Sequence, residues 1–536
     1  MFIHHTDHDI TGILLQAIQK MHADGDTLLT FEKGSYHFYP DNAFEQVSCI
    51  SNHDNDGFKR IALPFFDFDG LTVDGNGSDF IFHGIILPIE IGNCKNTVLQ
   101  NFSIDCAIAP YAHATVLEAS AHMLKIRIWD NTPFQVVHHS LRFSLGDHEL
   151  WETNFFLDID ATTDMCTEGT YRIPCQNMDA VTDPDDPQIV TLLGDFLHIP
   201  AIGNTVCFHF GIRWTSGIFI HNSENTFLKN VSVHSSLGMG ILAQLCKNLT
   251  FKHLRITPSA GRYMSVPADG THFVNCSGQI HLENCLMEKH FDDCLNCHGI
   301  YMQIQQILDR RTVLAKLVHH QQQGLTLFHP HERVELVNHK TLLPRCKNHV
   351  SSFEHISRSL AIIQFEEEIE DSVQLLDCIE SIDACPDLTV KNCTLQKAFP
   401  RGLLITTRGN VLIENNYFQT TASAIHISGD CNNWFESGYV QNMIIQNNTF
   451  YRCGIAKASG RTPNYNVINI VPSISTPDIS GEYFHKNICI TGNQFITAHP
   501  NVLKAVSVQN LIFRQNTFDI SEPIVTLTNC DGKIQI

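Results

Sequence analysis

Three carboxylates in one stretch of this 536-residue chain could do hydrolytic chemistry together. Asp269 lies in the segment PADGTHF, and Asp292 and Asp293 lie about one repeat later in KHFDDCLNCHG. Hydrolysis of a glycosidic bond needs two carboxyl groups, one protonated to assist the leaving oxygen and one ionised to activate water or attack carbon. An inverting enzyme keeps them roughly 6.5 to 9.5 Å apart so that a water fits between them. Whether these acids meet depends on how the chain between them folds.

An internal repeat predicts that fold. Seven segments share one template of a polar Asn or Asp, a short alternating strand, an Asn-rich turn and a second short strand; they begin at Asn225, Asn248, Asp387, Asn410, Asn442, Asn487 and Asn510. Three of the intervals are 23 residues, from Asn225 to Asn248, from Asp387 to Asn410 and from Asn487 to Asn510. This period is typical of one rung of a parallel β-helix, in which asparagine side chains at the same turn can hydrogen-bond from rung to rung.

A column of glycines supports the same register. A glycine stands eight residues before the turn position in four rungs, namely Gly217, Gly240, Gly270 and Gly402. The residues just before this column are Ser216, Met239, Asp269 and Arg401, and counting forward from Asn284 adds Asp293, with Cys294 in the glycine place. We therefore expect Asp269 and Asp293 on adjacent rungs, about 4.8 Å apart in backbone, with Arg401 on the next rung. Asp292 lies one residue outside the column.

The stacked acids have two interpretations. Two carboxylates at that spacing repel each other, so at least one should have a raised pKa unless Arg401 or a solvated groove compensates. An acid pair of this kind suits hydrolysis. A stabilising acid ladder or a calcium site is the alternative, because carboxylates are the ligands that calcium prefers.

The presence or absence of the repeat divides the rest of the chain into segments. An amphipathic helix is expected over Asp9–Ala23, capped by Asp7 or Asp9, with one apolar side made of Ile10, Ile13, Leu14, Ala17, Ile18 and Met21. The repeat is replaced twice by alternating apolar and polar segments typical of antiparallel β-barrels or sandwiches. The all-β chain therefore divides into N-terminal helix and first coils (1–106), first insertion (107–211), central coils (212–302), second insertion (303–377) and C-terminal coils (378–536).

The composition of the chain limits the classes of partner that it can bind. The chain has 35 Lys and Arg against 56 Asp and Glu, a formal charge of -21, which argues against nucleic acid or an anionic membrane as partner and suits a neutral one such as a carbohydrate. No membrane span or signal segment is evident, so we expect a cytoplasmic protein as the sequence stands, or a secreted or periplasmic one if it was trimmed. The 19 cysteines are an odd number, and several occupy apolar repeat positions (Cys285, Cys393, Cys489), which favours reduced core residues over a disulfide framework.

Several motifs together resemble one known family. PADGTHF, KHFDDCLNCHG, the spacing between Asp269 and Asp292, the WFESG turn and the two insertions are similar to glycoside hydrolase family 110, the bacterial α-1,3-galactosidases, over nearly the whole chain. The resemblance implies a right-handed parallel β-helix with two β-barrel insertions. It also implies inverting hydrolysis without metal or other cofactor, releasing terminal α-1,3-linked galactose from blood group B or linear α-1,3-galactosyl glycans. Asp292 would be the general acid, while Asp269 and Asp293 would hold and activate the water. A homodimer is the oligomer to test for.

Seven neighbours are candidates for contact with sugar. They are Arg401, His272, Asn296, His298, Trp434, Glu436 and Arg262. Strand alternation could turn His272, Asn296 or His298 into the core, Trp434 and Glu436 could be ordinary loop packing, and Arg262 could be a solvated charge. The segment HFGIRW (209–214) marks re-entry from the first insertion and carries no assigned role.

Two other classes of protein compete with this interpretation. A β-helical polyuronide hydrolase or lyase would need a basic groove, and a lyase would also need calcium, so a chelator separates it from a metal-independent hydrolase. A non-catalytic carbohydrate-binding solenoid predicts that Asp292→Asn leaves ligand behaviour unchanged. The hydrolase predicts loss of turnover with sugar still bound.

Overall fold

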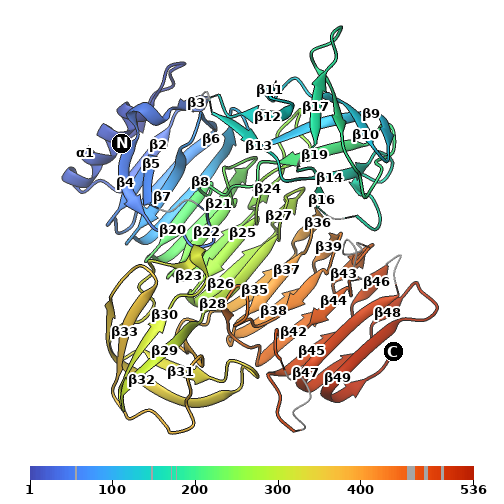
Figure 1. Ribbon diagram of the computed structural model, residues 1–536. Coiled ribbons are helices and arrows are strands. Elements are labelled where there is room, and N and C mark those ends of the chain that lie inside the picture. The colour runs from blue at the N-terminus through green and yellow to red at the C-terminus, as the bar shows by residue number, and fades with distance from the viewer. Residues whose placement is uncertain are drawn as a thin grey trace.

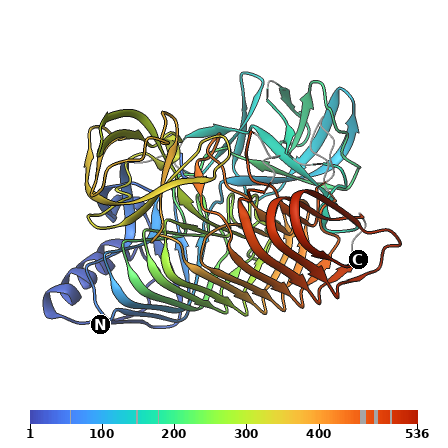
Figure 2. The ribbon, with the colours of Figure 1, turned by 90° about the horizontal axis from the view of Figure 1, so that it is seen from below.

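The chain is coiled into a parallel β-helix (Figure 1). The structure is a computed structural model that describes residues 1–54, 57–146, 149–170, 172–176, 178–455, 465–475, 481–496 and 500–536. Helix α1 (Thr11–Asp24) lies at the N-terminal end of the coil, and the two chain termini lie at opposite ends (Figure 2). The Asp9 carboxylate accepts a hydrogen bond from the Thr11 N–H at 2.9 Å. Among the described helices, none is long and apolar enough to cross a membrane.

The apolar face of α1 is narrower than its sequence pattern predicts. Leu14, Ile18 and Met21 are buried, whereas Ile13 is 57% exposed. The helix therefore contacts the first coils along one narrow stripe.

Parallel strands stack in three columns along the coil. We call the column that carries the acids the site sheet; its strands are β5 (Gly57–Phe66), β7 (Leu87–Gly92), β20 (Ile218–His221), β22 (Ile241–Gln244), β25 (Thr271–Val274), β28 (Leu295–Ile300), β37 (Leu403–Thr406), β40 (Ile425–Ile427), β44 (Ile468–Ile470) and part of β47 (Asn501–Arg514). The second column contains β1 (Phe2–Ile3), β2 (Leu28–Phe31), β6 (Thr72–Phe82), β8 (Lys95–Cys106), β21 (Glu224–Val233), β23 (Lys247–Lys252), β26 (Ser277–Glu283), β35 (Asp387–Lys391), β38 (Asn410–Glu414), β42 (Asn442–Gln446), β45 (His485–Thr491) and the far part of β47. The last strand, β49 (Ile524–Ile534), pairs with β47 along both columns. The third adds β3 (Ser35–Phe38), β24 (Arg255–Ile256), β27 (Leu286–Glu288), β36 (Thr394–Ala398), β39 (Tyr417–Thr420), β43 (Thr449–Tyr451), β46 (Gln494–Ile496) and β48 (Thr517–Phe518) to the far halves of β6, β8 and β21.

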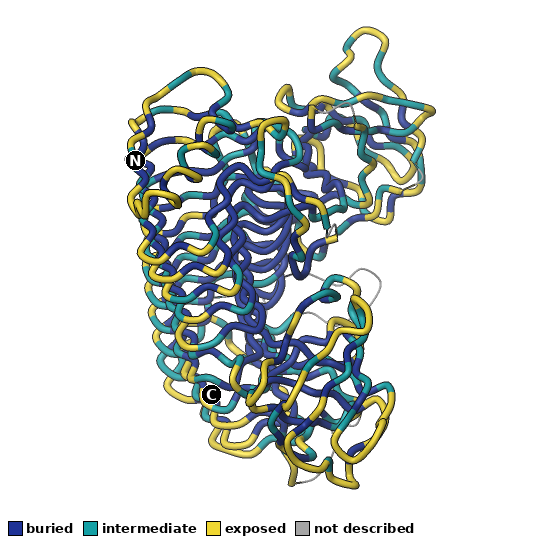
Figure 3. The backbone as a smooth tube through the Cα atoms, turned by 90° about the vertical axis from the view of Figure 1, so that its left-hand side faces the viewer, coloured by how far each residue is buried: buried dark blue, intermediate teal, exposed yellow. Residues whose placement is uncertain are grey.

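Burial explains why these segments form strands. In β35 the inward Leu388 and Val390 are buried and alternate with partly exposed residues, as expected for a sheet with one wet face. The strands β22, β25 and β28 are buried at every position, because the outer face of the site sheet is covered as well. Figure 3 shows this buried stretch running along the middle of the coil. Burial of each Leu, Ile or Phe side chain stabilises the folded state by roughly 1.5–3 kcal/mol.

Two antiparallel insertions lie on one side of the coil (Figure 2). The first has an eight-stranded sheet and a three-stranded sheet; its strands are β9 (Tyr111–Ser120), β10 (Met123–Ile128), β11 (Phe134–Val137), β12 (Ser140–Ser144), β13 (Leu150–Glu152), β14 (Phe155–Asp160), β15 (Met165–Cys166), β16 (Ile173–Pro174), β17 (Asp179–Thr182), β18 (Ile189–Leu193) and β19 (Thr205–His209). The second closes into a six-stranded barrel of β29 (Met302–Asp309), β30 (Thr312–Lys316), β31 (Arg333–Val337), β32 (Pro344–His355), β33 (Leu360–Phe365) and β34 (Cys378–Ser381). The expected architecture, a parallel β-helix with an N-terminal helix and two antiparallel insertions, is confirmed.

Four short elements complete the chain. They are η1 (Pro40–Asn42), β4 (Phe44–Ser48), η2 (His320–Gln322) and β41 (Glu436–Ser437). Strand β41 pairs antiparallel with the end of β28, so the loop after β40 folds back over two earlier rungs.

The asparagine stacks predicted from the repeat are present. Asn225 donates from Nδ2 to Oδ1 of Asn96 at 3.0 Å, and Asn248 donates in the same way to Asn225 at 3.0 Å. Both Asn225 and Asn248 have positive φ, near 58°, a conformation that asparagine tolerates better than most residues. The stacks therefore fix both the turn and the register from one rung to the next.

Candidate active site

The residues just before the site-sheet strands form one column. The acids stack in this column as the repeat predicts. Gly240 N–H donates to the carbonyl of Asp269, Gly270 N–H to that of Asp293 and Cys294 N–H to that of Arg401, at 2.9, 2.8 and 3.2 Å. A Cβ added at Gly240 would lie 2.5 Å from the Gly270 carbonyl oxygen, so close stacking requires glycine there. Asp269, Asp293 and Arg401 are thus on three successive rungs.

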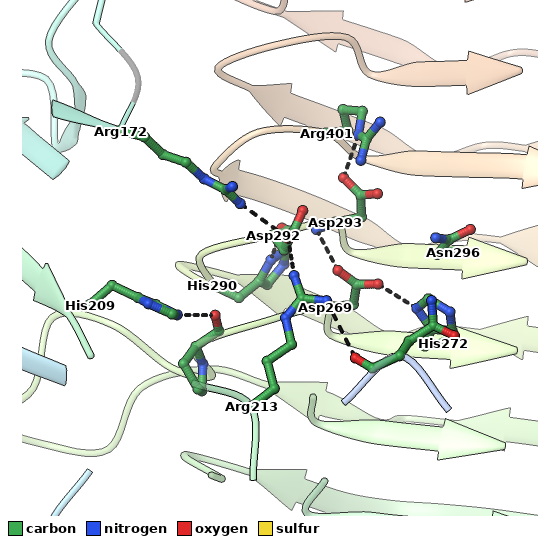
Figure 4. Close-up of polar contacts among 12 residues, drawn as sticks. Arg172, His209, Arg213, Asp269, His272, His290, Asp292, Asp293, Asn296 and Arg401 are labelled. Atoms are coloured by element: carbon green, nitrogen blue, oxygen red, sulfur yellow. Dashed lines mark hydrogen bonds and ion pairs between the residues drawn. The ribbon is translucent and has the colours of Figure 1, made fainter. Parts of the chain in front are cut away.

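Asp269, Asp292 and Asp293, which we call the acid trio, meet in one pocket (Figure 4). One carboxylate oxygen from each lies within 4.8 Å of the others, and the residues are only 4%, 8% and 1% exposed. The pocket has a volume of about 440 Å³, within the range of roughly 300–1,000 Å³ usual for small-molecule sites. The nearest oxygens are closer than the 6.5 Å lower bound for an inverting pair, so their separation does not assign the stereochemistry.

Two arginines hold Asp292. Its Oδ2 accepts from Nη2 of Arg213 at 2.7 Å and from Nη2 of Arg172 at 3.2 Å. Burial works to raise the pKa of Asp292, but the guanidiniums of Arg172, Arg213 and Arg401 outweigh it and keep the pKa below its usual value. Asp292 is therefore ionised at neutral pH.

The pKa values of Asp269 and Asp293 are shifted in the opposite direction from the pKa of Asp292. Burial, aided by the charge of Asp292, raises the pKa of Asp269 to about 7. Burial also raises the pKa of Asp293 well above its usual value, although Arg401 donates from Nε to its Oδ1 at 2.7 Å. The pocket thus combines one acid whose pKa is lowered with two whose pKa values are raised, a division of the kind that acid–base catalysis uses.

Two histidines extend from the trio into the core. His272 Nδ1 lies 2.5 Å from Oδ2 of Asp269, and its Nε2 lies 2.8 Å from Nε2 of His298. His298 is 3% exposed and lies behind His272 rather than in the pocket lining. Its Nε2 is 3.6 Å from Oε1 of Glu436, which does line the pocket.

Of the seven predicted sugar contacts, five line the pocket. They are His272, Asn296, Arg401, Trp434 and Glu436. Asn296 Oδ1 is buried and has no hydrogen-bond partner among the described residues, which leaves it an acceptor for a sugar hydroxyl. Trp434 is 36% exposed at the rim.

Arg262 is placed elsewhere. It forms an ion pair with Asp105 and donates to the carbonyls of Cys106 and Ala107 at 2.6 and 3.1 Å, where the chain leaves the coil for the first insertion. Because its guanidinium is held there and lies outside the pocket lining, we withdraw the sugar-binding role.

Other pocket residues come from segments that carried no predicted role. Arg172 belongs to the first insertion, Arg213 and His209 to the re-entry segment, Asn52 to the N-terminal coils and Gln321 to the second insertion. Asn52 Oδ1 and Gln321 Oε1 are also buried without a described partner. A basic residue in a re-entry loop is the one signal that could have suggested Arg213.

A larger groove of about 1170 Å³ lies between the N-terminal coils and the second insertion. Its buried acid, Glu90, is bonded to Gln46 Nε2 at 2.9 Å and lies 3.1 Å from His221 Nε2. Among the residues that the structure describes, no group of acids like the acid trio forms around Glu90, so we assign the chemistry to the smaller pocket.

The trio also has the composition of a divalent-cation site. Oxygen ligands suit Ca²⁺ or Mg²⁺, but Asp292 and Asp293 already bind guanidinium groups through three ion pairs. A cation would have to displace or repel these arginines. The donor set therefore fits a metal poorly.

A β-helix with an acid trio in a pocket covered by two insertions defines a carbohydrate-active enzyme of the glycoside hydrolase type. Residues 312–379 match the model of the GLAA-B beta-barrel domain II, which corresponds to the second insertion. Alpha-1,3-galactosidase B of Bacteroides thetaiotaomicron is 32% identical over 92% of this chain and 80% of its own length. Another alpha-1,3-galactosidase B, from Phocaeicola vulgatus, is 33% identical over 94% and 85%, and alpha-1,3-galactosidase A of Shewanella woodyi is 30% identical over 91% and 80%. The chain belongs to this family of bacterial α-1,3-galactosidases, glycoside hydrolase family 110.

Among solved structures, the A-module of mannuronan C-5 epimerase AlgE4 from Azotobacter vinelandii aligns with 97% of this chain and 96% of its own. The TM-score is 0.41 at 10% identity, too low to bear on the chemistry.

Proposed function

We propose that this chain is an exo-acting hydrolase that removes terminal α-1,3-linked galactose from glycans by an inverting, metal-independent mechanism. The observation that carries the proposal is the meeting of Asp269, Asp292 and Asp293 in one pocket. The names of the relatives supply the sugar and its linkage. Walls contributed by both insertions suit the end of a glycan better than its middle.

In the proposed reaction Asp292 gives its proton to the glycosidic oxygen as that bond breaks. Asp269 and Asp293 orient a water on the opposite face of the ring, and one of them takes the proton as the water oxygen attacks the anomeric carbon. Because Arg172 and Arg213 favour ionised Asp292, this role requires substrate to weaken the ion pairs. The Arg172 side chain is 41% exposed and comes from the first insertion, so it can move aside.

The pKa shifts of Asp269 and Asp292 favour a second assignment. Asp269, with its pKa of about 7, is itself suited to act as general acid, with ionised Asp292 as base. The two assignments of the general acid can be distinguished by changing the leaving group of the substrate. A nitrophenyl α-galactoside departs without help from an acid, so the variant that lacks the acid should lose far less rate on it than on a natural disaccharide.

The experiment compares Asp292→Asn and Asp269→Asn on both substrates, with azide added as a replacement nucleophile. Asp292→Asn should retain most activity on the nitrophenyl substrate only. Asp269→Asn should be slow on both until azide is present. The reverse pattern would exchange the two roles, and unchanged rates for both variants would remove the trio from catalysis.

Metal independence is tested directly. EDTA dialysis should leave the release of galactose from blood group B trisaccharide and from linear α-1,3-galactobiose unchanged. Loss of activity that returns with Ca²⁺ would place a cation in the trio instead.

A further inference from the structure

Two amide side chains in the wall of the acid-trio pocket have acceptor oxygens that the rest of the protein does not use. Asn52 Oδ1 and Gln321 Oε1 are buried and have no hydrogen-bond partner among the described residues. Both residues line the pocket, and Asn52 as a whole is 1% exposed. A buried polar atom without a partner costs free energy, so proteins rarely keep one without a use. The two oxygens therefore indicate contact with a ligand that donates hydrogen bonds.

A hydrogen bond to Asp54 fixes which end of the Gln321 amide faces the pocket. Gln321 Nε2 donates to Oδ1 of Asp54. If the amide were turned over, its oxygen would face the Asp54 carboxylate, and two acceptors repel each other. Asp54 is held in turn, because its Oδ2 accepts from the Arg213 backbone N–H at 2.9 Å. The part of the Gln321 amide that remains for a ligand is thus an acceptor only.

Asn52 and Gln321 come from distant parts of the chain but belong to one connected wall. The Asn52 N–H donates to the Gln321 carbonyl at 2.9 Å, so the N-terminal coils and the second insertion meet there. Gln322 Nε2 donates to the Trp434 carbonyl at 2.9 Å, which joins the same segment to the pocket rim. The two amide oxygens therefore lie on a surface that is held from three sides.

This wall lies on the Asp292 side of the acid trio. Arg213 donates from Nη2 to Asp292 Oδ2 at 2.7 Å and from Nη1 to the Asn52 carbonyl at 3.5 Å, so one guanidinium connects the two. Figure 4 shows the Arg213 side chain extending toward Asp292. In the proposed reaction Asp292 protonates the glycosidic oxygen, which joins the galactose to the sugar that leaves. Groups beside Asp292 thus face the leaving sugar.

The chemistry of the wall suits a neutral sugar at this position. Amide oxygens only accept hydrogen bonds, so they need hydroxyl or N–H donors. A hexose that carries galactose at O3 can offer hydroxyls at C2 and C4, on either side of the glycosidic oxygen. A uronic acid would bring a carboxylate toward these acceptors and toward Asp54, and both would repel it.

We propose that Asn52 and Gln321 form the binding site for the leaving sugar and accept hydrogen bonds from its hydroxyls next to the glycosidic bond. This role rests on the proposed function, with Asp292 as the general acid. A leaving group that lacks these hydroxyls leaves both oxygens unpaired, so the wall selects a neutral hexose at this position.

The proposal is tested by comparing α-1,3-galactobiose with α-galactosyl fluoride, whose leaving group has no hydroxyls. The measured quantity is the ratio of kcat/KM for galactobiose to kcat/KM for the fluoride. We expect this ratio to fall about tenfold in Gln321→Met and in Asn52→Gly, because each variant loses one hydrogen bond to the leaving sugar. Methionine is close to glutamine in size, and glycine suits the positive φ of 56° at position 52.

The matched controls change the same residue types outside the pocket lining. Gln323→Met alters the same segment of the second insertion, and Asn93→Gly alters another asparagine with a positive φ, 55°. Both should keep the wild-type ratio.

The outcomes separate this proposal from the one on which it rests. A wild-type ratio in both Gln321→Met and Asn52→Gly would overturn it, and equal slowing on the two substrates would place the amides against the galactose instead. If Gln321→Met does not fold, Asn52→Gly decides alone. If wild-type protein releases no galactose from either substrate, the proposed function fails first. Calorimetry then decides the amide role, since binding of galactobiose relative to free galactose should weaken about tenfold in both variants, and no change would overturn it.

Discussion

Arg401 binds Asp293 from the rung that follows it in space, although 108 residues separate the two in sequence. Its Nε donates to Oδ1 of Asp293 at 2.7 Å, and the second insertion occupies most of the chain between them. The coil thus brings a charge to the acid trio that no local segment supplies.

Removing that charge should impair catalysis in a pH-dependent way. Burial already raises the pKa of Asp293, and Arg401→Met should raise it further. A larger share of Asp293 then stays protonated at neutral pH, so kcat should fall by roughly 10- to 100-fold and recover partly at higher pH. Arg401→Lys keeps the charge and should lose less. A pH–rate profile of Arg401→Met with the wild-type shape would contradict this role.

The arginines at Asp292 should set one limb of the pH profile. Arg213→Gln removes a charge that lowers the pKa of Asp292, so that pKa should rise. If Asp292 is the general acid, the alkaline limb of kcat/KM moves to higher pH. Movement of the acidic limb instead would make Asp292 the base. Arg127→Gln, which removes the surface pair with Asp186, is the control and should move neither limb.

Stability should depend on pH through Asp269. The native carboxyl keeps its proton up to about pH 7, whereas the unfolded one loses it near pH 3.9. The native state therefore binds more protons between these values, and the free energy of unfolding falls as pH rises through this window. Asp269→Asn cannot ionise, so it should gain stability relative to wild type between pH 4 and pH 8, by up to roughly 4 kcal/mol.

Urea unfolding at the two pH values measures this difference. Asp160→Asn is the control, because hydrogen bonds from Thr162 and Thr163 lower the pKa of Asp160, so its pH-dependent contribution lies below about pH 4 and the variant should differ from wild type nearly equally at pH 4 and pH 8. A difference between Asp269→Asn and wild type that does not change with pH would show that Asp269 ionises normally.

An internal asparagine ladder should stabilise the C-terminal coils. Asn416 donates from Nδ2 to Asn448 Oδ1 at 3.0 Å, and Asn448 donates in turn to Asn493 at 3.0 Å. Asn448 is fully buried, and Asn448→Ala removes the acceptor of the Asn416 backbone N–H and Nδ2 as well as the donor to the Ile413 carbonyl, while Asn416 Nδ2 keeps its bond to the Val390 carbonyl. We expect a loss of roughly 2–5 kcal/mol.

Asn225→Gly is the comparison for Asn448→Ala. It removes two exposed ladder contacts, one to Asn96 and one from Asn248, but suits the positive φ at that turn, so it should cost under about 1 kcal/mol. Equal losses of unfolding free energy in the two variants would show that burial does not decide the effect.

The sequence predicts the coil well because its signals are local and repeated. Glycine at 217, 240, 270 and 402 and the asparagine turns specify the register, and this register alone places Asp269, Asp293 and Arg401 on successive rungs. The predicted contacts of His272 and Asn296 with the pocket follow from the same ladder, since strand pairing puts His272 beside Asn296. Glu436 reaches the pocket from β41, in the loop that folds back onto β28.

The residues of the pocket walls could not be predicted from the repeat. Arg172, Gln321 and Asn52 come from segments without a repeat, and their positions depend on how each insertion packs back onto the site sheet. Arg262 shows the converse error, because a charge near the acids in sequence is turned to the insertion junction by Asp105. Tertiary packing, which no local pattern encodes, decides these positions.

The anomeric form of the first galactose released tests the central claim most directly. Blood group B trisaccharide and linear α-1,3-galactobiose are incubated with the protein, and the anomeric proton of free galactose is followed by NMR before mutarotation. Inversion at the acid trio predicts β-galactose first, with Asp292→Asn silent on the same substrates. Initial α-galactose would contradict inversion, and no galactose from either substrate would contradict the assignment of activity.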